Sequence, residues 1–200
     1  MKINYACSLG QYCHTAELLK QNNFKFCSYP FDWIPSNFNT ILHCIEDEFK
    51  IFLDKSYYIN ISYSQRGHKF YDNNMFFHHD PLGNAEHYEY FVRCVDRFKN
   101  LLTQTEHKLF TMLFINMEKK DDNFKKNIID FNNKFSRHTS NYTLLVILHV
   151  PNKKENYHEF TYDDNIHFLE LHTLSNSNGL KFNNDKDNEY LNNVIKNRYN

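Results

Sequence analysis

The chain has no long apolar segment and almost no net charge. Its longest apolar run, Tyr142 to Val150, is interrupted by His149 and is far too short to cross a bilayer. The amino-terminal residues 1–8 contain no apolar signal core. With 23 basic and 24 acidic side chains, the formal charge of −1 gives no general attraction to nucleic acid or to an anionic membrane. We therefore expect a soluble cytoplasmic protein that binds neither nucleic acid nor membrane.

Paired cysteines and cofactor fingerprints are also missing. The five cysteines form no C-x-x-C pair, and their odd number disfavours a complete disulfide framework. We expect reduced thiols, of which at least one is free to act as a nucleophile. The sequence has no G-x-G-x-x-G, P-loop or H-E-x-x-H motif, and no cofactor is expected. The excess of Asn, Lys, Ile, Phe and Tyr over Gly, Pro and Ala is typical of an AT-rich coding genome, so this abundance carries no functional information.

What the chain does have is an alternation of apolar runs and amphipathic segments over 200 residues, the size of one ordinary domain. The apolar runs predict buried strands at residues 3–8, 108–116, 142–150 and 166–173. Apolar periodicity predicts helices at residues 11–20, 36–52 with Ser36 as N-cap, 86–103, 119–137 and 185–199. Residues 54–85 are expected to form a long loop with one short strand near 57–61. This order favours a single α/β domain, residues 1–200, with a mainly parallel sheet flanked by helices on both faces in a three-layer, Rossmann-like arrangement.

Polar residues follow the carboxyl ends of all four expected strands. Residues 8–13 come after the first strand, and Asn116, His149 and His172 lie at the ends of the other three. In open α/β sheets, ligands bind at this edge because loops and helix N-termini converge there. We therefore expect a substrate site at this edge, with Ser8, Gly10, His149 and His172 among its residues.

Cys13 is the strongest candidate nucleophile. It is expected in the first turn of a helix, where unpaired backbone N–H groups and the helix dipole favour a thiolate and lower the thiol pKa. The N–H groups of the Gly10 turn could bind a developing oxyanion. Such a nucleophile needs a histidine base and an orienting carboxylate. The sequence leaves open which residues these are, the bases being His78, His79, His149 or His172 and the carboxylates Asp32 or Asp80. The alternative is a structural Cys13 that packs the first helix.

Ser8 and Asp32 each have a structural alternative. Ser8 ends a strand before a turn, as a nucleophilic serine can, but a serine there also caps the turn. Asp32 stands beside the only tryptophan, Trp33, in a loop framed by Pro30 and Pro35. It is either a catalytic carboxylate or a turn residue whose carboxylate accepts backbone N–H groups. Trp33 is expected in the substrate site.

Two further groups are candidates for binding anions or metals. His78, His79 and Asp80 contain two metal-ligand types and a carboxylate, but adjacent residues rarely ligate one ion, and no metal site is expected. Arg93 and Arg97 lie one turn apart on an expected helix and could bind a phosphate or carboxylate. The alternative for both arginines is a solvated helix flank.

Two motifs together resemble the amino-terminal signature of a known family. They are Ser8-Leu9-Gly10-x-x-Cys13-x-x-Ala16-x-x-Leu19 and Ser28-x-Pro30-Phe31-Asp32-Trp33. The family has no established function and is described as papain-like cysteine peptidases; residues 77–80 and 93–98 match it more loosely. The resemblance implies a thiol hydrolase with Cys13 as nucleophile, His78 or His79 as base, and Asp32 or Asp80 as third member. Papain's own C-G-x-C-W context is absent, and a parallel α/β sheet is predicted here in place of papain's helical half and barrel.

Three functions follow from these residues. The first is a thiol-dependent hydrolase that uses Cys13 on a small-molecule or peptide substrate. The second is a nucleotide-sugar or phosphate-dependent transferase, in which the Gly10 turn and a helix N-terminus bind phosphate, Arg93 and Arg97 assist, and Asp32 or Asp80 is the base. The third is a non-catalytic binding module, favoured if the histidines and Asp32 are hydrogen-bonded in the core and no cleft opens near Cys13. The sequence does not determine the substrate or the oligomeric state.

Overall fold

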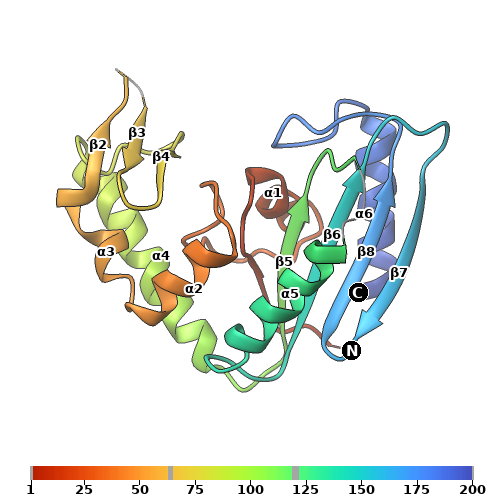
Figure 1. Cartoon of the computed structure of the whole chain (residues 1–200), viewed down its shortest axis with the longest axis horizontal. Helices are drawn as coiled ribbons and strands as arrows, with labels where there is room; N and C mark the ends of the chain where they lie inside the picture. Colours follow the sequence, from red (N-terminus) through yellow and green to blue (C-terminus); the bar gives the residue numbers. More distant parts are fainter. Residues whose placement is uncertain (1, 63–64, 119–121, 200) are drawn as a thin grey trace.

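The computed structural model describes residues 2–62, 65–118 and 122–199. Within them, a five-stranded, mostly parallel sheet is flanked by helices, and a small three-stranded antiparallel sheet lies apart from it (Figure 1). The main sheet has the order β1-β5-β6-β8-β7 and is formed by β1 (Tyr5–Ser8), β5 (Lys108–Phe114), β6 (Tyr142–Val150), β7 (Tyr157–Asp163) and β8 (Ile166–His172). The helices are α1 (Cys13–Gln21), α2 (Phe38–Glu46), α3 (Lys50–Leu53), α4 (Ala85–Thr103), α5 (Asp122–Phe135) and α6 (Asp185–Tyr199). The mixed α/β class and the mainly parallel sheet agree with the prediction; a Rossmann-like classification and a single domain stay predictions.

The four predicted strands are parallel and consecutive in the sheet, and their side chains explain why. Cys7 of β1 pairs with Phe110 of β5, which pairs with Leu144 of β6. All three are buried, because helices cover both faces and leave no solvated side for a polar residue. Strand β7, which the sequence analysis missed, pairs antiparallel with β8 at the sheet edge. Its sequence, YHEFTYD, is half polar and mostly exposed, as an edge strand permits.

The two faces of the sheet carry separate apolar cores. Phe110, Leu144 and Val146 belong to one core with residues of α2, α4 and α5. On the opposite face, Leu145 and Ile147 pack with residues of α1 and α6. The chain therefore turns to one face after β1 and to the other face after the neighbouring β5. Divergence of this kind at the carboxyl edge of a sheet is where α/β folds place their ligand crevices.

Residues 54–85 are not the long loop that the sequence predicted. They contain a 3-10 turn and an antiparallel sheet of β2 (Tyr58–Asn60), β3 (Arg66–His68) and β4 (Asp72–Phe76). The predicted strand near 57–61 corresponds to β2. Strands of three to five residues are too short to show a period of two, and this explains the missed strands β3 and β4. Residues 63–64 lie outside the described part of the chain.

The predicted helix 36–52 is broken, and its cap is not Ser36. Glu48 and Phe49 have φ angles of 57° and 61°, so α2 stops and the short α3 starts in a new direction. The N-cap is Asn37, whose side chain accepts the N–H of Thr40. Ser36 instead donates to the carbonyl of Leu9. The first residues of the predicted helix 119–137, numbers 119–121, lie outside the described residues. No helix of the described chain has the length and apolar character needed to cross a membrane.

Candidate active site

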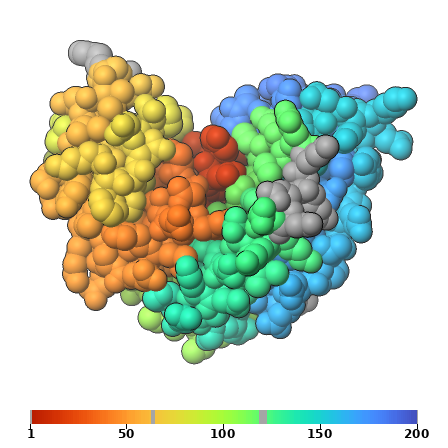
Figure 2. Space-filling model, viewed as in Figure 1, coloured from red at the N-terminus to blue at the C-terminus, as the bar shows by residue number. Residues whose placement is uncertain are grey.

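A cleft opens at the carboxyl edge of the main sheet. Figure 2 shows the molecule hollowed between the yellow segment of residues in the small sheet and the blue carboxyl-terminal segments, with red amino-terminal atoms at the floor. A cavity of about 350 Å³ lies against Cys13. The residues that line it come from four separate stretches of the chain: Tyr12, Cys13, Trp33, Pro35, Phe77, His78, Asn178, Gly179 and Leu180.

Cys13 and His78 meet in this cleft. Cys13 is the first residue of α1, and His78 follows the end of β4. The Sγ atom of Cys13 lies 3.6 Å from Nε2 of His78, within hydrogen-bonding distance for sulfur. The thiol is half-buried and the imidazole is exposed, so the pair can be reached from solvent. All five cysteines are free, so this thiol is not consumed by a disulfide.

The protonation of Cys13 differs from the expectation for a helix N-terminus. Burial raises the pKa of the Cys13 thiol; the residue's own backbone N–H lowers it, and the charge of Asp32 raises it further. The expected lowering by the helix end is therefore outweighed by burial. A thiolate at Cys13 thus depends on a base close enough to take its proton, and His78 is in that position.

The Gly10 turn joins the two halves of the amino-terminal motif. Gly10 has a φ angle of +82°, and a Cβ atom there would lie 2.1 Å from Oγ of Ser36 and 2.9 Å from the carbonyl oxygen of Phe31. Only glycine allows this approach between the turn and the loop that carries Asp32 and Trp33. The N–H of Gly10 donates to Oγ of Ser8 at 3.0 Å, and the N–H of Gln11 donates to Oγ of Ser36 at 3.2 Å. The donors expected to bind an oxyanion or a phosphate are thus already hydrogen-bonded.

Ser8 and Asp32 are both buried, each about 1% exposed. Asp32 Oδ2 accepts hydrogen bonds from Nζ of Lys25 at 2.5 Å and from the N–H of Tyr29 at 2.8 Å. Burial raises the pKa of the Asp32 carboxyl, while Lys25 and the Tyr29 N–H lower it. Asp32 therefore stabilises the conformation of its own loop. Lys25, which also donates to the carbonyl of Cys27 at 2.5 Å, escaped the sequence analysis because nothing in its local pattern marks a buried amine.

The adjacent side chains of His78, His79 and Asp80 point to different partners. The ring of His79 stacks on Tyr90 at 4.5 Å, and burial, followed by the nearby His87 and His78, lowers its pKa to about 4. Asp80 makes a two-pronged ion pair with Arg66, with N–O distances of 2.8 and 2.7 Å. Among the described residues no carboxylate hydrogen-bonds to His78, and no group of three His, Cys, Asp or Glu side chains is arranged to hold a metal ion.

His149 holds the loop that forms one wall of the cleft. Its Nδ1 accepts the N–H of Asn116 at 3.1 Å, and its Nε2 lies 2.6 Å from Oγ1 of Thr173. Burial lowers the pKa of His149 to about 4, so the ring is neutral. The Asn116 side chain and the Ser177 backbone exchange two further hydrogen bonds, of 2.8 and 2.9 Å. His149 therefore stabilises the loop of Asn178 to Leu180 indirectly, through Asn116 and Ser177, and it is not among the residues that line the cleft.

That loop is attached directly to α1. The carbonyl of Gly179 accepts the N–H of His14 at 2.8 Å. The ring of His14 is hydrogen-bonded to Oγ of Ser177 at 2.9 Å. The sequence analysis missed this wall because no local sequence pattern shows that the loop around Gly179, 165 residues after His14, contacts α1. The Asn178-Gly179 pair was the available turn signal.

The remaining candidates lie outside the lining of this cleft. Nε2 of His172 is 2.9 Å from Oε1 of Glu170, and its ring stacks on Tyr157 at 3.9 Å. Arg97 donates to the carbonyl of Ser28 at 3.0 Å. Arg93 is exposed on α4. The two arginines therefore do not form a joint anion site with the Gly10 turn.

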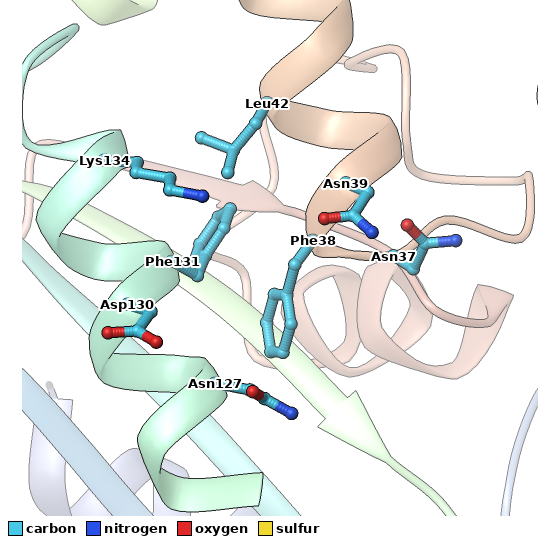
Figure 3. Close-up of a pocket in the computed structure, with 8 residues that line it drawn as sticks. All are labelled: Asn37, Phe38, Asn39, Leu42, Asn127, Asp130, Phe131 and Lys134. Carbon is cyan, nitrogen blue, oxygen red and sulfur yellow. The ribbon is translucent and has the colours of Figure 1, made fainter. Parts of the chain in front are cut away.

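A second cavity, of about 320 Å³, lies between α2 and α5 (Figure 3). The rings of Phe38 and Phe131 stack at 4.9 Å on its wall. Its lining is otherwise mostly amide and charged side chains, the full set being Asn37, Phe38, Asn39, Leu42, Asn127, Asp130, Phe131 and Lys134. It contains no thiol, hydroxyl or imidazole, so it lacks the thiol and histidine pair found at Cys13.

A family model described as "Putative papain-like cysteine peptidase (DUF1796)" matches residues 4–152. The match includes both Cys13 and His78. The loop of Asn178 to Leu180, with β7, β8 and α6, lies beyond it. Neither a curated protein nor a solved structure matches the chain.

Proposed function

The chain belongs to this DUF1796 family, and on that premise we propose that it is a thiol-dependent hydrolase in which Cys13 is the nucleophile and His78 the general base. The observation that carries the proposal is the 3.6 Å distance between Sγ of Cys13 and Nε2 of His78 inside an open cleft. A nucleophile and base at such a separation are typical of a thiol hydrolase before substrate binds.

The geometry supports a two-residue mechanism. Nε2 of His78 takes the thiol proton, and Sγ of Cys13 attacks the carbonyl carbon of the substrate. The backbone N–H of Cys13, which lowers the pKa of the thiol, is the proposed donor for the developing oxyanion. His78 then protonates the leaving group, and water activated by His78 hydrolyses the thioester. Asp32 and Asp80 take no step, because each is engaged by a cation elsewhere.

The two other functions have less support. A phosphate-dependent transferase would use the N–H groups of Gly10 and Gln11, which are occupied by serine hydroxyls, and Arg97, which binds a backbone carbonyl. For a binding module, part of the expected pattern is present, since Asp32 and His149 are hydrogen-bonded in the core. The cleft at Cys13 favours the hydrolase over that reading.

The proposal is tested with p-nitrophenyl acetate, a small activated ester that reports on thiol catalysis. Hydrolysis by the protein is expected to be lost in Cys13→Ala and retained in Cys27→Ala, a matched control at another half-buried thiol. The melting temperature of each variant shows whether it is folded. A folded Cys13→Ala protein that keeps the full rate would contradict the proposal.

A further inference from the structure

The wall of the Cys13 cleft is almost entirely apolar. Three of its large side chains are unusually exposed for their type, with Tyr12 at 46%, Phe77 at 48% and Leu180 at 46%. Together with Trp33 and Pro35 they surround the thiol on several sides. Large apolar side chains left open to water around one cleft mark a site that is covered by an apolar ligand. His78 is the only histidine, lysine or arginine among the residues that line the cleft.

The loop of residues 178–181 offers few free N–H groups to a peptide. Enzymes and domains that bind an extended peptide pair its main chain with free N–H and C=O groups. Here the N–H of Gly179 donates to Oγ of Ser177 at 3.1 Å, and its carbonyl accepts from His14. The N–H groups of Leu180 and Lys181 both donate to Oδ1 of Asn178 at 2.9 Å.

Two further groups near the Trp33 loop are also not available to a peptide. Pro35 has no N–H group at all. The neighbouring Ser36 hydroxyl is used within the protein, where it donates to the carbonyl of Leu9 at 2.7 Å. The N–H groups of the 179–181 loop are therefore already used within the protein, and the lining that this cleft presents to a substrate is mainly apolar.

Building on the proposed function, we propose that the cleft receives the apolar acyl chain of an ester or thioester, and that Cys13 is an acyl-group acceptor. The cavity of about 350 Å³ has room for about a dozen water-sized groups, which corresponds to an acyl chain of about six to ten carbons. Aromatic and aliphatic side chains from the N-cap of α1, from the Trp33 loop, from the residue after β4 and from the Leu180 loop would surround this chain.

The reaction balances with groups that are present. A bond forms between Sγ of Cys13 and the acyl carbon, and the bond from that carbon to the alcohol oxygen or thiol sulfur breaks. The proton that His78 took from Cys13 passes to the departing alcohol or thiol. Water then attacks the thioester, its proton passes through His78 to Sγ, and the free fatty acid leaves. No oxidant, reductant or metal is required.

The test measures kcat/KM for p-nitrophenyl acetate, butyrate, hexanoate and octanoate, alongside cleavage of fluorescently labelled casein. From acetate to octanoate kcat/KM is expected to rise at least about tenfold, because each buried methylene favours binding by a factor of about three to four, so that burying only about two of the added methylenes gives this rise. Leu180→Asp is expected to reduce the ratio of octanoate to acetate rates about tenfold. Leu82→Asp, which changes an exposed leucine outside the cleft, should leave that ratio unchanged.

The outcomes separate this inference from the function on which it rests. Ester hydrolysis that needs Cys13 but does not depend on chain length, or casein cleavage that needs Cys13, would overturn the acyl inference and leave the thiol hydrolase standing. If no ester or casein turnover depends on Cys13, both proposals fall.

Discussion

Sγ of Cys13 and Nε2 of His78 lie 3.6 Å apart although 65 positions separate the two residues in the sequence. Cys13 is placed by β1 and the Gly10 turn, both of which are largely buried. His78 is placed by the small antiparallel sheet, since it follows the end of β4. The geometry of the site therefore depends on the stability of the Gly10 turn and of the segment after β4, and the two can be tested separately.

Gly10→Ala is expected to destabilise the protein much more than Gly179→Ala. Both glycines have positive φ angles, of 82° and 94°, so both variants incur a backbone cost of roughly 1–2 kcal/mol. At Gly10 the new methyl would also collide with Ser36 and the carbonyl of Phe31, whereas at Gly179 its nearest contact is 3.8 Å away. The collision adds about 2 kcal/mol or more. Urea unfolding curves of the two variants measure the difference, and equal losses would show that Gly10 is not needed to join the turn to the Trp33 loop.

Lys25→Met is expected to cost about 3 kcal/mol of folding free energy, because it leaves the Asp32 carboxylate buried without its cation. The double variant Lys25→Met/Asp32→Asn should lose less than the sum of its single variants, since the buried charge has been removed with its partner. Chemical unfolding of the four proteins completes the cycle. Additive losses would mean that Lys25 and Asp32 do not depend on each other.

The pH dependence of Lys25→Met follows from the same carboxylate. Burial already raises the pKa of Asp32, and loss of Lys25 raises it further. In the range between the unfolded and folded pKa values, the folded state binds more protons than the unfolded state, so stability falls as pH rises. The deficit of Lys25→Met relative to the wild type should therefore shrink as pH is lowered from 7 toward 5. A deficit that grows on acidification would contradict this account.

Asp80→Asn is expected to reduce both stability and activity. The ion pair with Arg66 fixes the segment two residues after His78, and its loss should cost about 1 kcal/mol for a partly exposed pair. Partial burial raises the pKa of Asp80, but the Gly83 N–H and Arg66 outweigh it and lower that pKa below its usual value. The contribution of the pair is therefore present above the usual carboxyl pKa and is lost as pH falls through the lower folded value.

Glu89→Gln is the matched control. Glu89, like Asp80, is a carboxylate that follows His78 in the sequence, and it is exposed. Thermal unfolding at pH 7 and near pH 3, with ester hydrolysis at pH 7, checks the expectation. If Asp80→Asn and Glu89→Gln behave alike at pH 7, the Asp80 pair does not position His78.

Sequence patterns sufficed wherever burial imposes a regular period. The strand at 142–150 and the helix at 185–199 were predicted with the bounds of β6 and α6, because continuous apolar runs and a periodic stripe both reflect packing against the sheet. Strand β7 escaped prediction because an exposed edge strand carries no such pattern. The break at Phe49 escaped it because the apolar stripe continues across a change of helix direction.

The candidate site was predicted less completely than the fold. The sequence predicted that Cys13 follows the first strand, and in the structure it begins α1, just after β1. Sequence spacing could not choose among His78, His79, His149 and His172 as its partner. The structure places Nε2 of His78 3.6 Å from Sγ of Cys13, whereas the ring of His79 stacks on Tyr90. The wall around Gly179 is formed by a loop that is distant from Cys13 in the sequence, and no local pattern predicts that the two meet.

The measurement that tests the account most directly is the rate at which iodoacetamide alkylates Cys13, followed by mass spectrometry from pH 5 to pH 10. Because burial raises the thiol pKa, reaction near neutral pH requires that His78 take the proton. The alkylation profile of His78→Ala is expected to lie at higher pH than that of the wild type. His79→Ala should follow the wild type. If the wild type and His78→Ala give the same profile, then Cys13 and His78 do not act as a pair, and the proposed hydrolase is contradicted.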